Sequence, residues 1–349
     1  MSAPAGTPLP LVSVIMPVRN EGPFITTCLD AVLGQDYPAE RMEVFVADGM
    51  STDRTPEIVR SYAARDPRVH LVENRGRIVP TGMNAAFPLT KGEIIVRVDG
   101  HCKIAPDYVS RCVAHLRADG VDGVGGPVRT VGETRVARTI ALAMSSAFGV
   151  GGSAFRTVSD RTMLADTVPF PAYTRAIVER AGPYDEEQVR NQDDEYNYRL
   201  RKLGAKILLA SDVTSEYYSR SSVRSLWRQY YQYGYWKVRV LQKHPRQMKM
   251  RQFVPAAFVA ALAAALVAVP FAGWVPAACV AGLYAAANIA ASLLTARRES
   301  AALVPLLALA FATLHVSYGL GFLAGLARFV HLWGRSRPPA FSPHLPGAS

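Results

Sequence analysis

Three uncharged apolar runs near the carboxyl end of the chain constrain its fold more than any other feature. They cover residues 253–274, 275–296 and 301–327, and the third is broken only by His315 and a few small polar residues. About 20 apolar residues suffice to cross the hydrocarbon core of a bilayer. The runs therefore predict about three membrane helices within residues 253–330, followed by a tail at 331–349. The alternative is a buried helix pair in a soluble core, which needs fewer such runs.

Charge divides the chain in the same way. The net charge is +11, but from Arg220 onward 14 Lys and Arg residues face a single acidic residue, Glu299. That portion therefore carries +13, and the portion before it carries −2. A basic, apolar portion favours a membrane over nucleic acid as the partner. The basic cluster at 236–252 predicts a cytosolic location for the part before it, because positive charge marks the cytosolic flank of a span.

The two ends of the chain bear on the topology. The first ten residues lack the basic and apolar regions of a signal peptide. The four cysteines of the chain form no CxxC pair, which is compatible with a reducing cytosol. The basic carboxyl end, with Arg328, Arg335 and Arg337, conflicts with three spans, which would place it outside. Either the third run is re-entrant or interfacial, or the charge rule fails here.

The first half of the chain alternates between strand and helix patterns. Apolar runs predict strands at 11–18, 42–48, 69–74 and 93–98, and helical spacing predicts helices at 24–35, 56–64 and 81–87. Such alternation indicates βαβ units with right-handed crossovers and parallel strands. We predict a helix at 134–148 and a loop rich in Gly, Ser and Thr at 149–167. We predict a cytosolic α/β domain at 1–220 and an amphipathic, basic interfacial segment at 221–252.

Acidic residues gather at the predicted strand ends and at one helix start. The three groups are Asp48 with Asp53, Asp99 with His101, and Asp193 with Asp194 and Glu195. Each has an ordinary structural alternative, namely a helix cap, a turn residue or a complement to a helix dipole. Their order along a βα pattern favours a ligand site, because open α/β sheets bind ligands beyond the carboxyl ends of their strands.

Four ordered blocks resemble a known family. PVRNE (17–21), ADGMSTDRT (47–55), VRVDGH (96–101) and QDDEYNYRL (192–200) resemble the signature blocks of family 2 inverting glycosyltransferases with the GT-A fold. Five segments are similar to membrane-bound exopolysaccharide enzymes of the succinoglycan-biosynthesis type. They are VRVDGH (96–101), FGVGGSAFR (148–156), DTVPF (166–170), RNQDDEYNYRLRKLG (190–204) and RQYYQYGYWK (228–237). The resemblance covers roughly residues 11–240 and implies a Rossmann-like mixed sheet with flanking helices, followed by transmembrane helices.

The resemblance also implies a donor site with a divalent metal. The family's Asp-x-Asp block reads Asp99-Gly100-His101 here, so His101 replaces the second carboxylate and leaves the choice between Mn²⁺ and Mg²⁺ open. Pro17 and Glu21 are expected on the first loop, near ribose and base. Arg77 could instead be a surface charge, and Asn84 a helix-surface residue. The residues predicted to bind the nucleotide sugar are Pro17, Arg19, Glu21, Asp48, Arg77 and Asn84.

A carboxylate must take the proton from the attacking hydroxyl of the acceptor. Matching the family's pattern places Gln192 at its Glu, Asp193 at its catalytic Asp and Glu195 at its second Asp, with Asp194 as a rival base. The helix pattern at 224–239 resembles the family's acceptor-side helix but lacks the Gln-x-x-Arg-Trp block of processive synthases. An ordinary core helix is the alternative. Residues predicted at the acceptor or the membrane interface are Asp166, Arg228, Gln229 and Trp236.

These features predict an inverting, metal-dependent hexosyltransferase at the inner (plasma) membrane, multi-pass and with its catalytic domain in the cytosol. It is expected to move a hexose from a nucleotide sugar, UDP-glucose or UDP-galactose, to a polyprenyl-diphosphate-linked saccharide in exopolysaccharide biosynthesis. One alternative is a polyprenyl-phosphate sugar synthase, in which the lipid phosphate attacks and hardly needs a base. Another is a non-catalytic membrane scaffold for polysaccharide assembly.

Overall fold

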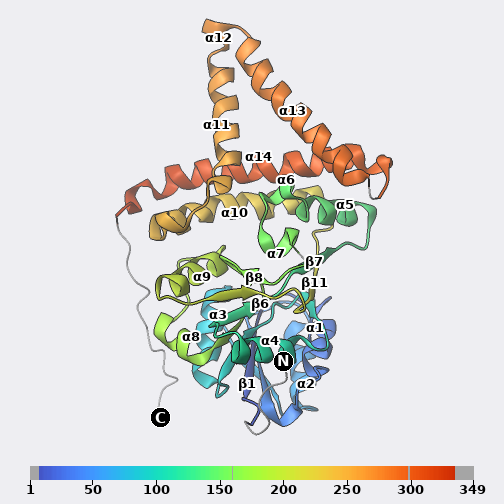
Figure 1. The fold of residues 1–349 in the computed structure, drawn as a ribbon, viewed down its shortest axis with the longest axis vertical. Helices are drawn as coiled ribbons and strands as arrows, with labels where there is room; N and C mark the ends of the chain where they lie inside the picture. Colours follow the sequence, from blue (N-terminus) through green and yellow to red (C-terminus); the bar gives the residue numbers. More distant parts are fainter. Residues whose placement is uncertain (1–7, 159, 298, 335–349) are drawn as a thin grey trace. The chain divides into compact units, whose positions relative to one another are not determined.

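The computed structural model describes residues 8–158, 160–297 and 299–334, and within them the chain forms two compact units (Figure 1). The first, which we call the sheet unit, contains the residues up to Gly126 together with Thr162–Val213. The second, the helical unit, contains Pro127–Arg161 and Thr214–Trp333. Arg335 and Arg337, used above to argue topology, lie outside the described residues.

The sheet unit is built on a mixed sheet, as predicted. Its eight described strands follow the order β3-β2-β1-β4-β9-β6-β10-β8. The first four in that order are mutually parallel, β9 runs antiparallel to β4 and β6, and β8 runs antiparallel to β10. The strands are β1 Val12–Val18, β2 Met42–Asp48, β3 Val69–Glu73, β4 Ile94–Arg97, β6 Gly123–Gly125, β8 Met163–Leu164, β9 Ala172–Thr174 and β10 Ile207–Leu209.

The predicted elements of the first half are confirmed within a few residues. β1 is buried along its whole length and has a strand on each side, which explains its unbroken apolar run. Helix α2 has Pro56 in its first turn, where proline costs no hydrogen bond. The helices of this unit are α1 Ile25–Leu33, α2 Thr55–Ala63, α3 Val79–Ala86, α4 Tyr108–Ala118, α8 Arg175–Ala181 and α9 Gln192–Lys202, and a short strand β5 spans Cys102–Ile104.

The segment predicted as a helix and a loop at 134–167 is more structured than expected. It contains α5 Arg135–Met144, α6 Ala147–Val150 and α7 Ala154–Thr157 before β8. Ser146 starts α6 by accepting a hydrogen bond from the Phe148 N–H, and Gly151 ends it in a left-handed conformation. The small polar residues that suggested a loop are therefore the caps of short helices.

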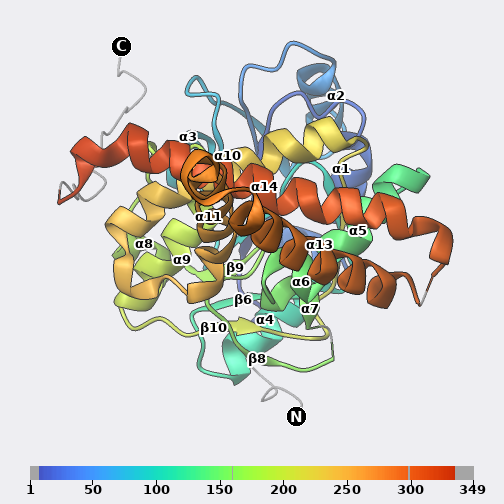
Figure 2. The ribbon, with the colours of Figure 1, turned by 90° about the horizontal axis from the view of Figure 1, so that it is seen from above.

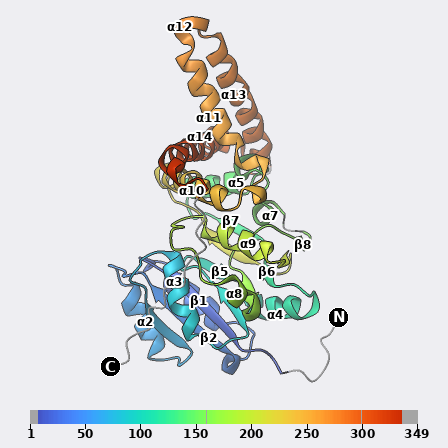
Figure 3. The same ribbon diagram turned by 90° about the vertical axis from the view of Figure 1, so that its left-hand side faces the viewer.

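The helical unit combines a strand pair with long helices. Strands β7 Val128–Val131 and β11 Ser215–Tyr218 are parallel. Helices α10 and α14 lie along one another, whereas α11 and α13 form a hairpin that projects away from them (Figures 1, 2 and 3). The long helices are α10 Val223–Lys243, α11 Val254–Val267, α13 Val275–Ala296 and α14 Val304–Phe329, with the short α12 Val269–Ala272 between α11 and α13.

Glycines let α10 and α14 approach until their backbones touch. A Cβ added to Gly321 would lie 2.0 Å from the Tyr231 carbonyl oxygen, and one added to Gly234 would lie 2.0 Å from the Tyr318 carbonyl oxygen. Close packing through small residues is typical of helices in lipid, where burial of apolar surface gives little driving force.

Two described helical stretches are long and apolar enough to cross a membrane, Val275–Ala296 and Ala301–Leu332. The first of the three predicted runs is divided, because α11 ends at Val267 and Pro270 lies in the first turn of α12. The chain thus has carboxyl-terminal apolar helices that could span a membrane, while the number of spans stays a prediction.

Candidate active site at the carboxyl ends of the strands

The loops that follow β1 and β2 are fastened to each other. The Asn20 N–H donates to Ser51 Oγ (2.8 Å), and the Thr52 N–H donates back to Asn20 Oδ1 (2.8 Å). The Gly22 N–H donates to Asp53 Oδ2 (2.9 Å). Because β1 and β2 are parallel with Val18 opposite Asp48, these contacts form a single rim at the carboxyl edge of the sheet. Asp53 therefore has a structural task in this rim.

The same rim contains unusual backbone conformations. Asn20, Met50 and Arg77, which follow β1, β2 and β3, have φ angles of 55°, 56° and 63°. Left-handed conformations at residues such as Met and Arg cost roughly 1–3 kcal/mol and concentrate at functional sites. Arg77 and Arg19 are exposed, and neither side chain makes a hydrogen bond or ion pair among the described residues. Both cations are thus available to an anionic ligand.

Two predicted donor residues lie within strands. Asp48 is buried at the end of β2, where its carboxylate accepts hydrogen bonds from the Ser51 N–H (3.0 Å) and hydroxyl (2.5 Å). Pro17 lies inside β1 and not on the first loop, which corrects the predicted position. Pro17 has no N–H to donate, and it follows the last hydrogen bond on this side of β1, from the Val98 N–H to the Ile15 carbonyl (3.0 Å).

A buried arginine joins the two central carboxylates. The Arg97 side chain is 4% exposed; its Nε donates to Asp99 Oδ1 (2.9 Å) and its Nη2 lies 2.8 Å from the same atom. Its Nη1 contacts Asp193 Oδ1. Burial lowers the pKa of the guanidinium, but Asp99 more than offsets this and the pKa is raised, so Arg97 stays charged. Sequence analysis missed this residue, although a charge inside the buried strand pattern IIVRV was a visible signal.

Asp99 contacts Arg97, and His101 contacts Glu21 on the loop after β1. No hydrogen bond involves Asp99 Oδ2 within the described residues. His101 Nδ1 lies 2.9 Å from Glu21 Oε1. Gly100 permits this approach, since a Cβ there would lie 2.9 Å from Glu21 Cγ. No group of three or more His, Cys, Asp or Glu side chains suited to a metal ion was found among the described residues.

The three acidic residues in the first turn of α9, Asp193, Asp194 and Glu195, have different surroundings. Glu195 is buried and ion-paired with Arg199 (Nη2–Oε2 2.9 Å), whose Nη1 also donates to the Ala181 and Pro183 carbonyls. Asp193 is 39% exposed and contacts Arg97, while Asp194 is half-buried. Gln192 is buried, and its Oε1 has no hydrogen-bond partner in the described part of the chain. The structure therefore brings Asp193 and Asp99 together through Arg97.

Other predicted residues have structural partners. The Asn84 amide donates to the Tyr184 carbonyl (2.9 Å) and accepts from the Tyr184 N–H (2.7 Å), so it fastens α3 to the segment before α9. Asp166 pairs with Arg201 (3.2 Å). For both, a part in substrate binding stays a prediction.

The remaining predicted residues belong to α10 in the helical unit. Arg228 is exposed. Gln229 is buried and donates to the hydroxyls of Tyr217 (3.2 Å) and Tyr233 (3.0 Å). Trp236 packs against Tyr235 and Phe329.

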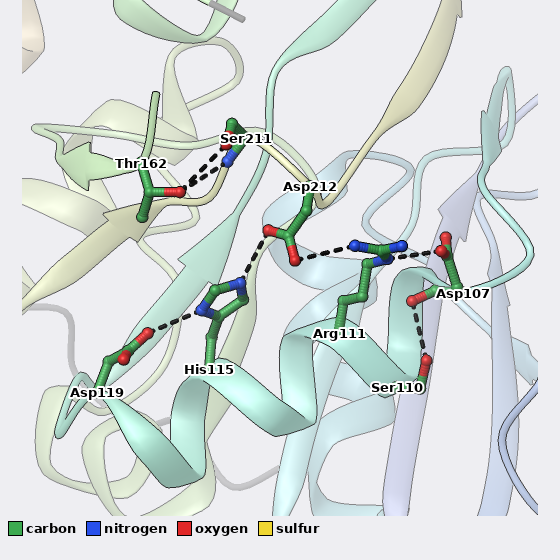
Figure 4. Close-up of polar contacts among 8 residues, drawn as sticks. All are labelled: Asp107, Ser110, Arg111, His115, Asp119, Thr162, Ser211 and Asp212. Carbon is green, nitrogen blue, oxygen red and sulfur yellow. Dashed lines mark hydrogen bonds and ion pairs between the residues drawn. The ribbon is translucent and has the colours of Figure 1, made fainter. Parts of the chain in front are cut away.

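A second polar cluster in the sheet unit lies between α4 and the segment after β10 (Figure 4). The His115 ring nitrogens lie 2.7 Å from Asp119 Oδ2 and 2.8 Å from Asp212 Oδ1. Arg111 bonds Asp212 (3.1 Å) and Asp107 (2.5 Å). Every carboxylate in this cluster has a cationic or imidazole partner, which indicates a fastening of α4 to the chain that follows β10.

The mixed α/β sheet of this chain matches the GT-A-like fold of solved glycosyltransferases. The mannosyltransferase PcManGT from Pyrobaculum calidifontis, solved with GDP-Man and Mn²⁺, superposes with a TM-score of 0.58 at 24% identity over 93% of this chain and 89% of that one. TarS residues 1–349 from S. aureus superpose with a TM-score of 0.53 at 20% identity over 90% of each chain.

The chain belongs to glycosyl transferase family 2, whose model matches residues 13–181. It is 31% identical over 318 residues to the succinoglycan biosynthesis protein ExoA of Rhizobium meliloti, covering 90% of this chain and 95% of that protein. It is also 27% identical over 240 residues to a dolichyl N-acetyl-α-D-glucosaminyl phosphate diacetamido-dideoxy-glucuronosyltransferase of Methanococcus voltae, covering 66% of this chain and 74% of that protein.

Proposed function

We propose that this family 2 glycosyltransferase moves a hexose from a nucleotide sugar, UDP-glucose or UDP-galactose, to a polyprenyl-diphosphate-linked saccharide in exopolysaccharide biosynthesis. The observation that carries the proposal is the contact of the buried Arg97 with both Asp99 and Asp193. It joins the carboxylate expected at the donor diphosphate to the carboxylate expected at the acceptor hydroxyl. The likeness to a succinoglycan biosynthesis protein over nearly the whole chain supports an exopolysaccharide acceptor.

Asp193 acts as the general base in this mechanism. An ionised carboxylate is the form that accepts a proton, and the guanidinium of Arg97 stabilises that form. The acceptor hydroxyl gives its proton to Asp193 while its oxygen attacks the anomeric carbon and the nucleoside diphosphate leaves from the opposite side. A single displacement of this kind inverts the anomeric centre. A glycosidase would need two carboxylates arranged around a water molecule.

The side chains at the end of β4 fit a divalent cation. Asp99 is held through Oδ1, which leaves Oδ2 to serve as a hard ligand, and His101, whose Nδ1 lies beside Glu21, would be the second residue to hold the ion. Two protein ligands are enough where substrate phosphates supply the others, as is usual for Mg²⁺. When bound, Mn²⁺ or Mg²⁺ supplies positive charge to the leaving diphosphate. Arg19 and Arg77 offer further positive charge to the donor from the neighbouring loops.

The exposed apolar helices support a location in a membrane, with the sheet unit on the cytosolic side. α11 and α13 expose large apolar side chains, among them Val267 (75%) and Leu283 (76%), which in water would be an unusually large apolar surface. Arg251 precedes this hairpin and Arg297 follows it, so both of its ends carry the positive charge typical of the cytosolic side. The inner (plasma) membrane is therefore the proposed location.

Nucleotide release by the purified protein tests the function. The assay uses UDP-, GDP- and TDP-sugars with Mn²⁺, Mg²⁺ or EDTA, and with or without a membrane lipid extract. We expect UDP release from one hexose donor, abolished by EDTA and increased by the lipid extract. UDP release that is not increased by the lipid extract would contradict the proposed lipid-linked acceptor. Absence of both UDP release and nucleotide binding would favour a non-catalytic scaffold.

A further inference from the structure

The FGVGGSAFR segment, residues 148–156, contributes no residue to the chemistry proposed above, yet it has a defined structure. Gly151 and Gly152, with φ angles of 63° and 69°, connect α6 to α7. Arg251 Nη1 donates to the carbonyls of both glycines, at 3.1 Å to Gly151. The segment is therefore fixed to the basic stretch that precedes the apolar hairpin, and it ends with Arg156 on α7.

Arg156 lies on one face of the β7–β11 strand pair. Thr130 and Tyr217 are opposite each other in the register, and Arg156 Nη1 donates to Thr130 Oγ1 (3.1 Å). The guanidinium carbon is 5.6 Å from the centre of the Tyr217 ring and 5.2 Å from that of Phe155. Its Nε and Nη2 make no hydrogen bond or ion pair with any described residue. Arg156 is thus an oriented guanidinium with unused donors.

Helix α10 adds polar groups at the hydroxyl of Tyr217. Gln229 is 8% exposed and bonds the hydroxyls of Tyr217 and Tyr233, while its Oε1 is buried and has no hydrogen-bond partner within the described chain. If the amide is flipped, its oxygen accepts from both hydroxyls and its NH₂ group becomes the unpaired one. In either orientation a buried amide group lacks a partner, which is uncommon unless a ligand supplies one.

The charge on this face is positive. Arg220 is exposed, and its side chain makes no hydrogen bond or ion pair among the described residues. The carboxylate next to Tyr217, that of Glu216, is opposite Arg129 in the register and ion-paired with it at 3.7 Å. Because successive side chains of a strand point to opposite faces, this pair lies on the other face. Burial raises the pKa of the Tyr217 hydroxyl, so the hydroxyl is protonated and can donate.

We propose that Arg156, Tyr217, Gln229 and Tyr233 form a binding site for the phosphate groups of a polyprenyl diphosphate, the headgroup of the lipid-linked acceptor. The inference rests on the proposed function and assigns residues to its acceptor side. A guanidinium fork flanked by hydroxyl and amide donors is suited to phosphate oxygens. The exposed apolar helices α11 and α13 of the same unit indicate that the phosphate is attached to a lipid.

Binding of radiolabelled farnesyl diphosphate to the full-length protein in detergent tests the site. We expect Arg156→Gln and Gln229→Leu each to weaken binding by about tenfold or more, because a charged or buried hydrogen bond is lost. Arg156→Lys, which keeps the charge without the fork, should give an intermediate loss. The matched control is Arg129→Gln, which removes an arginine from the opposite face of the same strand pair and should bind like the unmodified protein.

Competitors distinguish the sources of the phosphate. Unlabelled farnesyl diphosphate should compete best, while inorganic diphosphate, farnesol and phosphatidylglycerol vesicles should compete at least tenfold less well. Equal competition by inorganic diphosphate would reduce the site to an anion site, and equal competition by the vesicles to general membrane adhesion. Either result overturns the proposal, as does unchanged binding by Arg156→Gln. If that variant fails to fold, Arg156→Lys and Gln229→Leu decide in the same way.

The failure of this inference can be told from the failure of the proposed function. Nucleotide-sugar binding by Arg156→Gln should equal that of the unmodified protein. Sugar transfer with an unchanged KM for the acceptor in Arg156→Gln would overturn the phosphate site and leave the transferase intact. Arg156-dependent binding of farnesyl diphosphate by a protein that binds no nucleotide sugar would do the reverse.

Discussion

At the scale of single residues, Arg97 is the group on which the proposed chemistry depends. A guanidinium with a side chain 4% exposed is stable only when its charge is compensated, and Asp99 and Asp193 provide that compensation. In return it holds both carboxylates in place. The sequence placed these carboxylates 94 positions apart with nothing to connect them, so their association is a product of the fold.

The base assignment can be tested by removing one charge at a time. We expect Asp193→Asn to lower kcat by a factor of about 10²–10⁴, the usual contribution of a general base, with nucleotide-sugar binding unchanged. Asp194→Asn is the matched control and should retain most activity. The measurement is sugar transfer alongside donor binding by calorimetry. Full turnover by Asp193→Asn would instead favour the polyprenyl-phosphate synthase, whose acceptor already carries its nucleophilic charge.

The role of Arg97 is tested by a pair of substitutions. Arg97→Met leaves two carboxylates without their buried cation and should destabilise the sheet unit by about 3–5 kcal/mol, the usual result of breaking a buried pair. Arg97→Lys keeps the charge but cannot match the forked contact, so we expect a folded protein whose kcat is reduced at least about tenfold. Thermal unfolding and transfer assays report the two effects. Normal kcat in the lysine variant would show that the fork is not required.

At the scale of elements, the contacts between helices and their neighbours follow from two different physical causes. The cluster of His115, Asp119 and Asp212 fastens α4 by charge, and its strength depends on pH. The α10–α14 pair is held by shape, because Gly321 and Gly234 allow carbonyl groups to approach where any larger side chain would clash.

The pH dependence of the α4 cluster has a defined sign. Burial lowers the pKa of His115, but the hydrogen bonds of His115 to Asp119 and Asp212 more than offset this and raise its pKa above 6.5. Burial raises the pKa of Asp212, but the hydrogen bonds of Asp212 to His115 and Arg111 more than offset this and lower its pKa below 3.8. The His115 contribution is therefore full below pH 6.5 and is lost as pH rises through the raised pKa. The Asp212 contribution is lost only as pH falls below 3.8.

We accordingly expect His115→Gln to lower the free energy of unfolding at pH 6 by about 1 kcal/mol or less, since the cluster is partly exposed. At about pH 8.5 the same substitution should have a smaller effect. Thermal unfolding between pH 5.5 and about 8.5 measures this. His70→Gln is the control, since His70 stacks on Phe45 in the same unit. An equal loss of stability at both pH values would show that His115 acts by packing alone.

The glycine contacts predict opposite effects of one substitution at two sites. Gly321→Ala should destabilise the helical unit by about 1–3 kcal/mol, because its Cβ would lie 2.0 Å from a backbone oxygen. Gly282→Ala on α13 meets no atom within 4 Å and should be neutral or slightly stabilising, since alanine favours helix. Thermal unfolding in detergent compares them. A destabilisation of equal size in both would mean that the close approach of α10 and α14 contributes nothing.

At the scale of the whole molecule, the hairpin of α11 and α13 is the feature on which the proposed membrane location depends. The second arm, α13, has 22 residues and a length of about 33 Å at 1.5 Å per residue, enough for the ~30 Å hydrocarbon core of a bilayer, whereas α11 with 14 residues reaches only about 21 Å. The tip of the hairpin exposes Phe271 (92%) and Trp274 (69%), the type of side chain found at membrane interfaces. α14 runs along α10 instead, and whether the third apolar run is interfacial or a span stays a prediction.

Cysteine labelling in intact cells tests this topology. In a protein whose exposed Cys279 is replaced by alanine, Gly273→Cys at the hairpin tip should react with a membrane-impermeant maleimide from outside. Ser300→Cys, in the turn before α14, should react only after the cells are opened. Labelling of neither position in intact cells would show that the hairpin enters the membrane without crossing it.

The sequence by itself determined the local elements and the family. Strand and helix periodicity placed the elements of the first half because those patterns reflect which side chains face the core, and the Asp-Gly-His and Gln-Asp-Asp blocks identified the family. Elements whose signal was short were missed. The predicted loop at 149–167 contains α7 and the second half of α6, because small polar residues precede short helices as well as loops.

The tertiary structure alone decided which distant residues meet. It placed Pro17 inside a strand, assigned Asn84 to fastening a loop, and brought Asp193 to Asp99 through Arg97. It also set α14 along α10 rather than beside α13, through glycine contacts that a hydropathy pattern does not record. The physical reason is common to all of these cases: periodicity reports whether a side chain is buried, whereas its partner depends on how separate segments pack.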